Sequence, residues 1–263
     1  MVRITISDLN NLKEKKQKIV MLTAYNYPFA KIIDKTPTHI ILVGDSLGMT
    51  SLGYDSTIPV TMEDMCSATS AVARGSASKL IVADMPFLSY QTSIETAVEN
   101  AGRIMRAGAH AVKIEGAEHI PAIQAIINAG IPVMGHLGFT PQSVNKLGGF
   151  KVQGTTAEAV KILVQHAQIL KEAGVFALVL EMVPAQAARE LTTAIDIVTL
   201  GIGAGIHVDG QVLVTDDLIG LFDKFKPKFV KQYTNISKTI EEAITTFNSE
   251  VQENQFPNNK HSY

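Results

Sequence analysis

The chain has 263 residues, a formal net charge of −2 and a sequence pI near 6.4, so no global field attracts nucleic acid or an anionic membrane, and small-molecule partners are favoured. Its single cysteine, Cys66, excludes an intramolecular disulfide and a cysteine-based zinc site, which indicates a reducing cytoplasm. Met1 is not followed by a signal-peptide pattern, and no apolar run approaches the roughly 18 residues of a membrane span, so we expect a soluble protein with no membrane partner.

The first predicted element is a helix over residues 7–17 with Leu9 and Leu12 inward, which we expect to close the bottom of a barrel. From Lys18 onward, short apolar runs alternate with longer segments of helical period, a pattern typical of repeated βα units. The predicted strands cover residues 19–23, 39–43, 79–83, 111–114, 132–135, 175–180 and 195–200, with a weaker eighth at either 206–208 or 211–214.

The clearest predicted helices cover residues 92–106 and 155–173, and three helices are expected to end at Gly108, Gly130 and Gly174. Near the C-terminus, apolar residues at 236, 240, 244, 247 and 251 predict an amphipathic helix, followed by a flexible tail over 253–263. The length is typical of one (β/α)8 barrel, about 250 residues. The sequence therefore predicts an α/β fold, a single (β/α)8 TIM-barrel domain over residues 1–263 with an N-terminal capping helix and extra C-terminal helices.

Four of the apolar runs end in a carboxylate, namely Asp45, Asp84, Glu115 and Glu181. Parallel strands buried on both faces read as continuous apolar runs, and ligands bind beyond their C-terminal ends. Asp45, Asp84 and Glu115 follow successive strands about 4.8 Å apart, so they are predicted to share one hard cation, with Mg²⁺ the first choice. The alternative is that each acid caps the following helix or lies in solvent.

Lys113 and Glu115 are two residues apart on one strand, so their side chains point to the same face, which in a barrel is the interior. A buried lysine needs an anionic partner to stay charged. Lys113 therefore predicts either a ligand carboxylate or a structural ion pair, for which Glu115 is within reach.

Three further residues are candidates for the site. Ser46 follows Asp45 and either donates a hydrogen bond to the same ligand or caps a helix. Glu181 ends a wholly apolar run, where desolvation would raise its pKa and make it a general base; the alternative is an ion pair with Arg189 or a place at a helix N-terminus. His136 either contacts the ligand or is structural.

The remaining polar signals have a structural interpretation. Residues 201–205, which are rich in glycine and follow a predicted strand, are able to present N–H groups to an anion but lack the dinucleotide-binding spacing. Late aspartates are interpreted as caps (Asp209, Asp216 and Asp217), and histidines without a partner at metal-ligand spacing as structural or exposed (His39, His110, His119 and His166).

Ordered motifs along nearly the whole chain resemble the ketopantoate hydroxymethyltransferase family. They are TAYN (23–26), VGDSLGM (43–49), GYDST (53–57), ADMPF (83–87) with Ser89 and Tyr90, VKIEG (112–116), GHLG (135–138), TPQ (140–142), GGF (148–150), Glu181 with Pro184, GIGAG (201–205) and DGQ (209–211). One departure is visible, because Ala68 stands where the family commonly has a histidine before Thr69.

The resemblance implies Mg²⁺ held by Asp45, Asp84 and Glu115, a keto acid bound through Asp45, Ser46, Asp84 and Lys113, and Glu181 as proton acceptor. It also implies transfer of a hydroxymethyl group from 5,10-methylenetetrahydrofolate to 3-methyl-2-oxobutanoate, which gives 2-dehydropantoate on the route to pantothenate and coenzyme A. Family members form large homo-oligomers, commonly decamers, so a homodecamer is expected.

Two other functions fit the same residues. A Mg²⁺-dependent carbon–carbon lyase of the phosphoenolpyruvate or pyruvate type would use a similar oxo-acid chelate without folate, but often with a cysteine near the site, whereas Cys66 is predicted on a helix. A non-catalytic barrel is disfavoured, since a site without function has no physical reason to keep buried charges.

Overall fold

The computed structural model describes residues 3–263, and the chain divides into two compact units after Val214. The first unit contains all eight strands, and the second contains the last two helices. The expectations of a single domain over 1–263 and of a flexible tail over 253–263 stay predictions.

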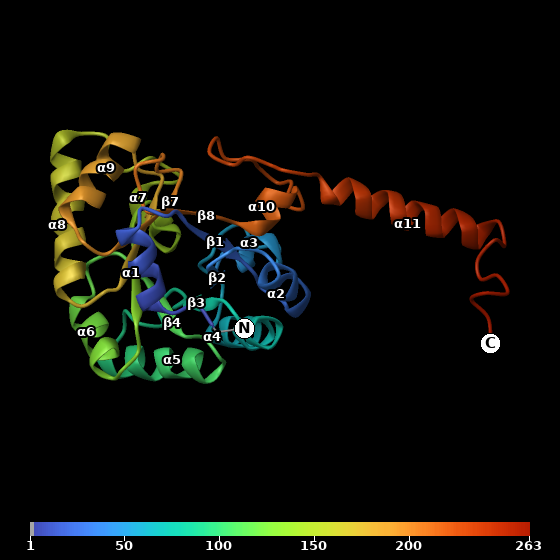
Figure 1. Cartoon of the computed structure of the whole chain (residues 1–263), viewed down its shortest axis with the longest axis horizontal. Helices are drawn as coiled ribbons and strands as arrows, with labels where there is room; N and C mark the ends of the chain where they lie inside the picture. Colours follow the sequence, from blue (N-terminus) through green and yellow to red (C-terminus); the bar gives the residue numbers. More distant parts are fainter. Residues whose placement is uncertain (1–2) are drawn as a thin grey trace. The chain divides into compact units, whose positions relative to one another are not determined.

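Eight parallel strands close into a barrel in sequence order, which confirms the predicted (β/α)8 fold (Figure 1). Each strand pairs with the next, and β8 pairs with β1. The strands are β1 (Ile19–Thr23), β2 (Ile40–Val43), β3 (Leu80–Asp84), β4 (Ala111–Glu115), β5 (Val133–Gly138), β6 (Ala177–Glu181), β7 (Val198–Ile202) and β8 (Gly210–Leu213).

Most helices of this unit lie around the outside of the strands (Figure 1). They are α1 (Ile6–Glu14), α2 (Tyr27–Asp34), α3 (Leu47–Thr50), α4 (Met62–Gly75), α5 (Ile94–Arg106), α6 (Ile120–Asn128), the 3₁₀ turn η1 (Pro141–Ser143), α7 (Val144–Leu147), α8 (Ala157–Glu172) and α9 (Ala185–Ala194). The helices predicted over 92–106 and 155–173 are α5 and α8. Both begin later than expected, because Ser93 and Thr156 cap them with side-chain oxygens.

The largest errors in the predicted strand boundaries lie at β5 and β7. β5 continues to Gly138, so His136 lies inside the strand and not after it. β7 runs from Val198 to Ile202, so the first two residues of the glycine-rich segment are strand residues. The eighth strand is Gly210–Leu213, which confirms the second of the two alternatives.

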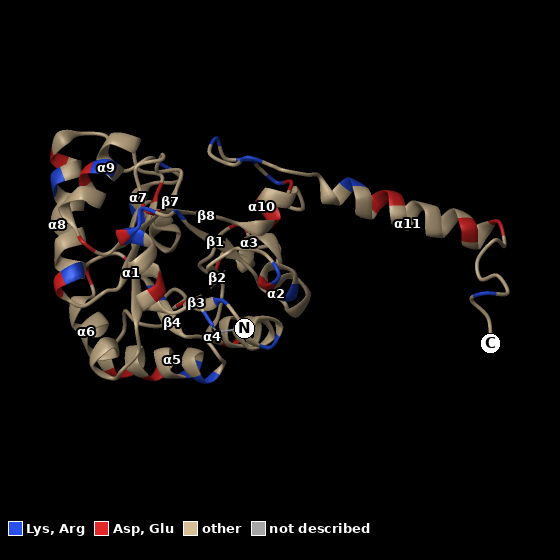
Figure 2. Ribbon diagram, in the orientation of Figure 1, with Lys and Arg blue, Asp and Glu red and all other residues tan. Residues whose placement is uncertain are grey.

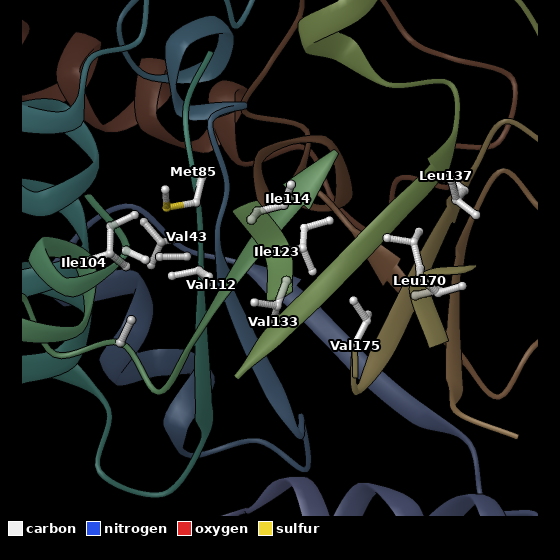
Figure 3. Packing of buried hydrophobic residues seen from close by; sticks show 14 of the residues in the cluster. Val43, Met85, Ile104, Val112, Ile114, Ile123, Val133, Leu137, Leu170 and Val175 are labelled. Atoms are coloured by element: carbon white, nitrogen blue, oxygen red, sulfur yellow. The ribbon is translucent and has the colours of Figure 1, made fainter. Parts of the chain in front are cut away.

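The core has two layers, as expected for strands buried on both faces. Outward-facing residues pack under the helices; Figure 3 shows Ile114 of β4 and Val133 of β5 beside Ile123 of α6. Alternate strand residues such as Met21 and Leu200 are fully buried outside this cluster and fill the barrel interior. Charged residues lie mainly on the outer helices, as Figure 2 shows for α5 and α8.

The N-terminal segment covers the bottom of the barrel, as predicted. Leu9 of α1 is fully buried, and Ile4 N donates to Ser78 O just before β3. Lys13 Nζ lies 2.9 Å from Asp209 Oδ2 just before β8, and the same oxygen accepts from Thr199 N. The prediction that Asp209 caps a helix is therefore wrong, because it joins α1 to β7 and β8.

The second unit contains α10 (Thr215–Ile219) and α11 (Ile236–Gln252). Asp216 and Asp217 lie in the first turn of α10, and their expected capping role stays a prediction. The apolar stripe predicted for the last helix is exposed on α11, where Ile244 and Phe247 are 57% and 52% accessible. Among the described residues, no helix is long and apolar enough to cross a bilayer.

Candidate active site

The strand ends place five charged or titratable side chains in the upper barrel interior. Cα partners across the ladder are Asp84 with Lys113, and Glu115 with His136. Glu181 ends β6 beside Gly138. Side chains at paired positions of parallel strands point to the same face, so the register itself brings these groups together.

Lys113 and Asp84 form a buried ion pair, with Nζ 2.9 Å from Oδ1 and both side chains at most 5% exposed. Burial lowers the pKa of Lys113, but the charges of Asp84, Glu115 and Asp45 outweigh burial and raise the pKa above its usual value. Lys113 is therefore a permanent cation. The structure thus shows the ion pair with Asp84, the neighbour in the register, and not with Glu115.

Asp45 lies two residues beyond β2 and is buried among other acids. Its backbone N donates to Asp84 Oδ2 at 3.0 Å, and its Oδ2 accepts from Gln142 Nε2 at 2.9 Å. Burial, followed by the charges of Asp84 and Glu115, raises the pKa of Asp45 well above its usual range. The acids therefore repel one another when they are ionised, and a cation bound beside them would relieve that repulsion.

His136 links the acidic cluster to Glu181. Its Nδ1 lies 3.5 Å from Glu115 Oε1 and 3.3 Å from Lys113 Nζ, and its Nε2 lies 3.3 Å from Glu181 Oε2. Burial and the charge of Lys113 lower the pKa of His136, but the contacts with Glu115 and Glu181 outweigh them and raise it to about 9. The imidazole therefore faces the candidate base, a role that the sequence did not predict.

Glu181 is less buried than the sequence suggested. Its side chain is 18% exposed, against 3% for Asp84 and Glu115, so the expectation of a desolvated carboxylate is wrong. The reason is its place at the rim of the barrel mouth. Gly138 adopts φ +95°, and a Cβ at this position would collide with the backbone oxygen of Glu181, so glycine is needed for β5 to leave the sheet there.

Ser46 is the N-cap residue immediately before α3, but its side chain makes no capping hydrogen bond. Its Oγ instead lies 2.8 Å from the hydroxyl of Tyr25, in the loop after β1. The capping alternative is therefore wrong, and the hydroxyl faces Tyr25 of the TAYN motif.

The donor set fits a hard divalent cation. Glu115 Oε1 is buried with no hydrogen-bond donor, and Asp84 Oδ1 contacts Lys113 without hydrogen-bond alignment. Among residues 3–263, no group of three His, Cys, Asp or Glu side chains is already arranged to hold a metal ion. Oxygen donors of this kind suit Mg²⁺. The assignment of Asp45, Asp84 and Glu115 as ligands stays a prediction.

Sequence reasoning missed Gln142 and Tyr90 as functional candidates. Gln142, in η1, is 5% exposed and hydrogen-bonded to Asp45, Glu115 and Tyr90. Neither follows a strand directly, so the strand-end pattern did not point to them. Their only signal was membership of the TPQ and Ser89–Tyr90 motifs.

A closed parallel barrel with buried acids, a lysine and a histidine at the C-terminal strand ends is the architecture of a barrel enzyme. The model of the ketopantoate hydroxymethyltransferase family matches residues 3–259, and the chain belongs to this family. A 3-methyl-2-oxobutanoate hydroxymethyltransferase of Moorella thermoacetica is 53% identical over 99% of this chain and 98% of its own. One from Caldicellulosiruptor bescii is 52% identical over 100% of both chains.

Solved structures support the fold independently. Phosphonopyruvate hydrolase, in complex with oxalate and Mg²⁺, superposes with a TM-score of 0.63 at 13% identity and covers 98% of this chain and 93% of its own. A 2,3-dimethylmalate lyase gives a TM-score of 0.63 at 12% identity, covering 98% and 91%. At this identity the likeness concerns the barrel alone.

Proposed function

We propose that the protein is a Mg²⁺-dependent enzyme that transfers a hydroxymethyl group from 5,10-methylenetetrahydrofolate to 3-methyl-2-oxobutanoate. The product is 2-dehydropantoate, and water supplies the hydroxyl oxygen. The observation that carries the proposal is the buried Asp84–Lys113 pair beside Glu115, one oxygen of which is buried without a hydrogen bond, in a chain of this family. Such a site offers both a cation position and a fixed positive charge to a 2-oxo acid.

The chain's own residues would bind and orient the keto acid. Lys113 keeps its proton and neutralises the substrate carboxylate, exchanging part of its contact with Asp84. Ser46, held by Tyr25, donates from its hydroxyl to the same carboxylate. A divalent cation held by Asp45, Asp84 and Glu115 would polarise the keto oxygen and stabilise negative charge that develops on it.

Glu181 would accept the proton from C3. Its carboxylate lies at the barrel mouth, where one side is open to substrate and the other faces His136 Nε2 at 3.3 Å. His136 would thereby orient Glu181, and its expected contact with the ligand stays a prediction. Loss of the C3 proton makes C3 the nucleophile that attacks the one-carbon unit. A positioned base contributes roughly 10²- to 10⁴-fold in rate.

Three finer expectations belong to this proposal. They are the folate co-substrate, a homodecameric assembly and a cytoplasmic location. Light scattering coupled to gel filtration tests the assembly directly, because a decamer has ten times the mass of one chain.

The test is an assay for 2-dehydropantoate with the purified protein. We expect product only when 3-methyl-2-oxobutanoate, methylenetetrahydrofolate and Mg²⁺ are all present. Product formation that is unchanged in excess EDTA would contradict the metal requirement. Cleavage of a branched 2-hydroxy diacid without folate would favour the lyase alternative, although Cys66 lies on α4, the helix before β3, and not on a strand.

A further inference from the structure

Gln142 contacts four separate parts of the upper barrel although it lies in the loop after β5. Its side-chain Nε2 donates to Asp45 Oδ2 and to Met85 O, both at 2.9 Å. Its backbone N donates to Glu115 Oε2 at 3.0 Å, and its Oε1 accepts from the Tyr90 hydroxyl at 3.0 Å. This one residue thus holds two of the three predicted metal ligands.

Two acceptors fix which way the amide of Gln142 points. Asp45 Oδ2 and Met85 O both accept from its NH₂ group, because neither oxygen has a proton of its own to donate. The amide oxygen then faces Tyr90, whose hydroxyl donates to it and holds it from the other side. A flipped amide would place oxygen against oxygen at both acceptors.

The hydrogen bonds occupy one oxygen of each carboxylate. Asp45 Oδ2 and Glu115 Oε2 are held by Gln142, and Asp84 Oδ2 is held by Asp45 N. The second oxygens of Asp84 and Glu115 are buried without a hydrogen bond. A carboxylate fixed through one oxygen presents the other in a defined direction, which is how outer residues orient metal ligands.

We propose that Gln142, held by Tyr90, is a positioning residue that orients Asp45 and Glu115 toward a divalent cation and so sets the affinity of the site, without contacting the cation or the substrate. The inference rests on the proposed function, which requires that cation. A simple loop anchor would hold the same backbone but leave cation affinity unchanged.

Gln142→Met removes the amide and keeps the length of the side chain and the backbone hydrogen bond to Glu115. We expect Mg²⁺ affinity about 10- to 100-fold weaker, the usual effect of losing an outer partner of a ligand. Turnover should recover to near the wild-type value at saturating Mg²⁺, since the ligands themselves remain. Tyr90→Phe leaves the amide in place but without the hydroxyl that holds its oxygen, so a smaller loss of affinity is expected.

The test is calorimetric titration of Mg²⁺ into metal-stripped protein. Gln153→Met is the matched control, because Gln153 lies in the same loop and its side chain bonds only Lys151 O. Wild-type affinity in Gln142→Met would overturn the inference, as would a loss of activity that saturating Mg²⁺ does not restore. Should that variant not fold, wild-type affinity in Tyr90→Phe would overturn it. Failure of the wild-type protein itself to bind Mg²⁺ would overturn the proposed function, and with it this inference.

Discussion

At the bottom of the barrel, Asp209 and Asp34 receive several hydrogen bonds each, whereas at the top Asp84 and Glu115 keep buried oxygens without one. Asp34 Oδ1 accepts from both the backbone and the hydroxyl of Ser78, and from Ser76. Burial raises the pKa of Asp34, but these hydrogen bonds outweigh it and lower the pKa, while the pKa of Asp45 at the top is raised. Charges at the bottom therefore stabilise the fold, and charges at the top are left available for a ligand.

The largest effect is expected from removing a predicted ligand at the top. Asp84→Ala takes away one carboxylate and leaves Lys113 buried without its partner, so Mg²⁺ affinity should fall more than about 100-fold, beyond the loss typical of outer partners. Calorimetric titration measures it. Unchanged Mg²⁺ binding would remove Asp84 from the ligand set.

Removing an acid at the bottom of the barrel should lower stability and leave Mg²⁺ affinity unchanged. Asp34→Ala leaves the donors of Ser76 and Ser78 without their acceptor, which should lower the free energy of unfolding by about 2 kcal/mol. Urea unfolding checks the loss, and the Mg²⁺ affinity of the variant should equal that of the wild type. A change in affinity without a change in stability would contradict the comparison.

Neutralising an acid at the top should stabilise the metal-free protein. Asp45→Asn removes repulsion with Asp84 and Glu115 and keeps an oxygen for the Gln142 amide, so unfolding in EDTA should cost about 1 kcal/mol more than in the wild type. The same change should weaken Mg²⁺ binding. If Asp45→Asn were less stable than the wild type in EDTA, the acids at the top of the barrel would also stabilise the fold, and the comparison would fail.

The smallest effect is expected in the pH dependence of stability, through a histidine at the bottom of the barrel. His110 Nδ1 accepts from Ile81 N at 2.9 Å, and burial together with the charge of Arg3 lowers its pKa to about 4. The unfolded chain binds the proton near pH 6.5, so stability is full above that pH and falls as the pH drops toward 4. His110→Gln should lose less stability between pH 7 and 5 than the wild type, in urea titrations. The exposed His207→Gln should behave like the wild type, and equal losses in all three proteins would contradict this assignment.

The sequence predicted the barrel and the positions of Asp45, Asp84 and Glu115, because strands buried on both faces give continuous apolar runs that end where the acids stand. It did not predict the end of β5. Residues 136–138, which contain histidine and glycine, have weak strand propensity, and they are strand residues because they pair with β6. Such pairing is a long-range property and leaves no local signal.

The roles of the loop residues could not be predicted from the sequence. Gln142 acts through hydrogen bonds to three strand ends that are far away along the chain, and a TPQ triplet in a loop carries no sign of them. The setting of Glu181 was likewise misjudged, since an apolar strand does not reveal that its last residue lies at an open rim. Both depend on how the loops fold over the barrel mouth.

The central claim is that Glu181 accepts the C3 proton while Asp45, Asp84 and Glu115 serve the cation. Exchange of that proton with deuterated solvent, followed by NMR on 3-methyl-2-oxobutanoate with Mg²⁺ and without folate, isolates this step. Glu181→Gln should bind substrate and Mg²⁺ but exchange roughly 10²- to 10⁴-fold more slowly, while the exposed control Glu190→Gln exchanges like the wild type. Exchange at the wild-type rate in Glu181→Gln would contradict the account.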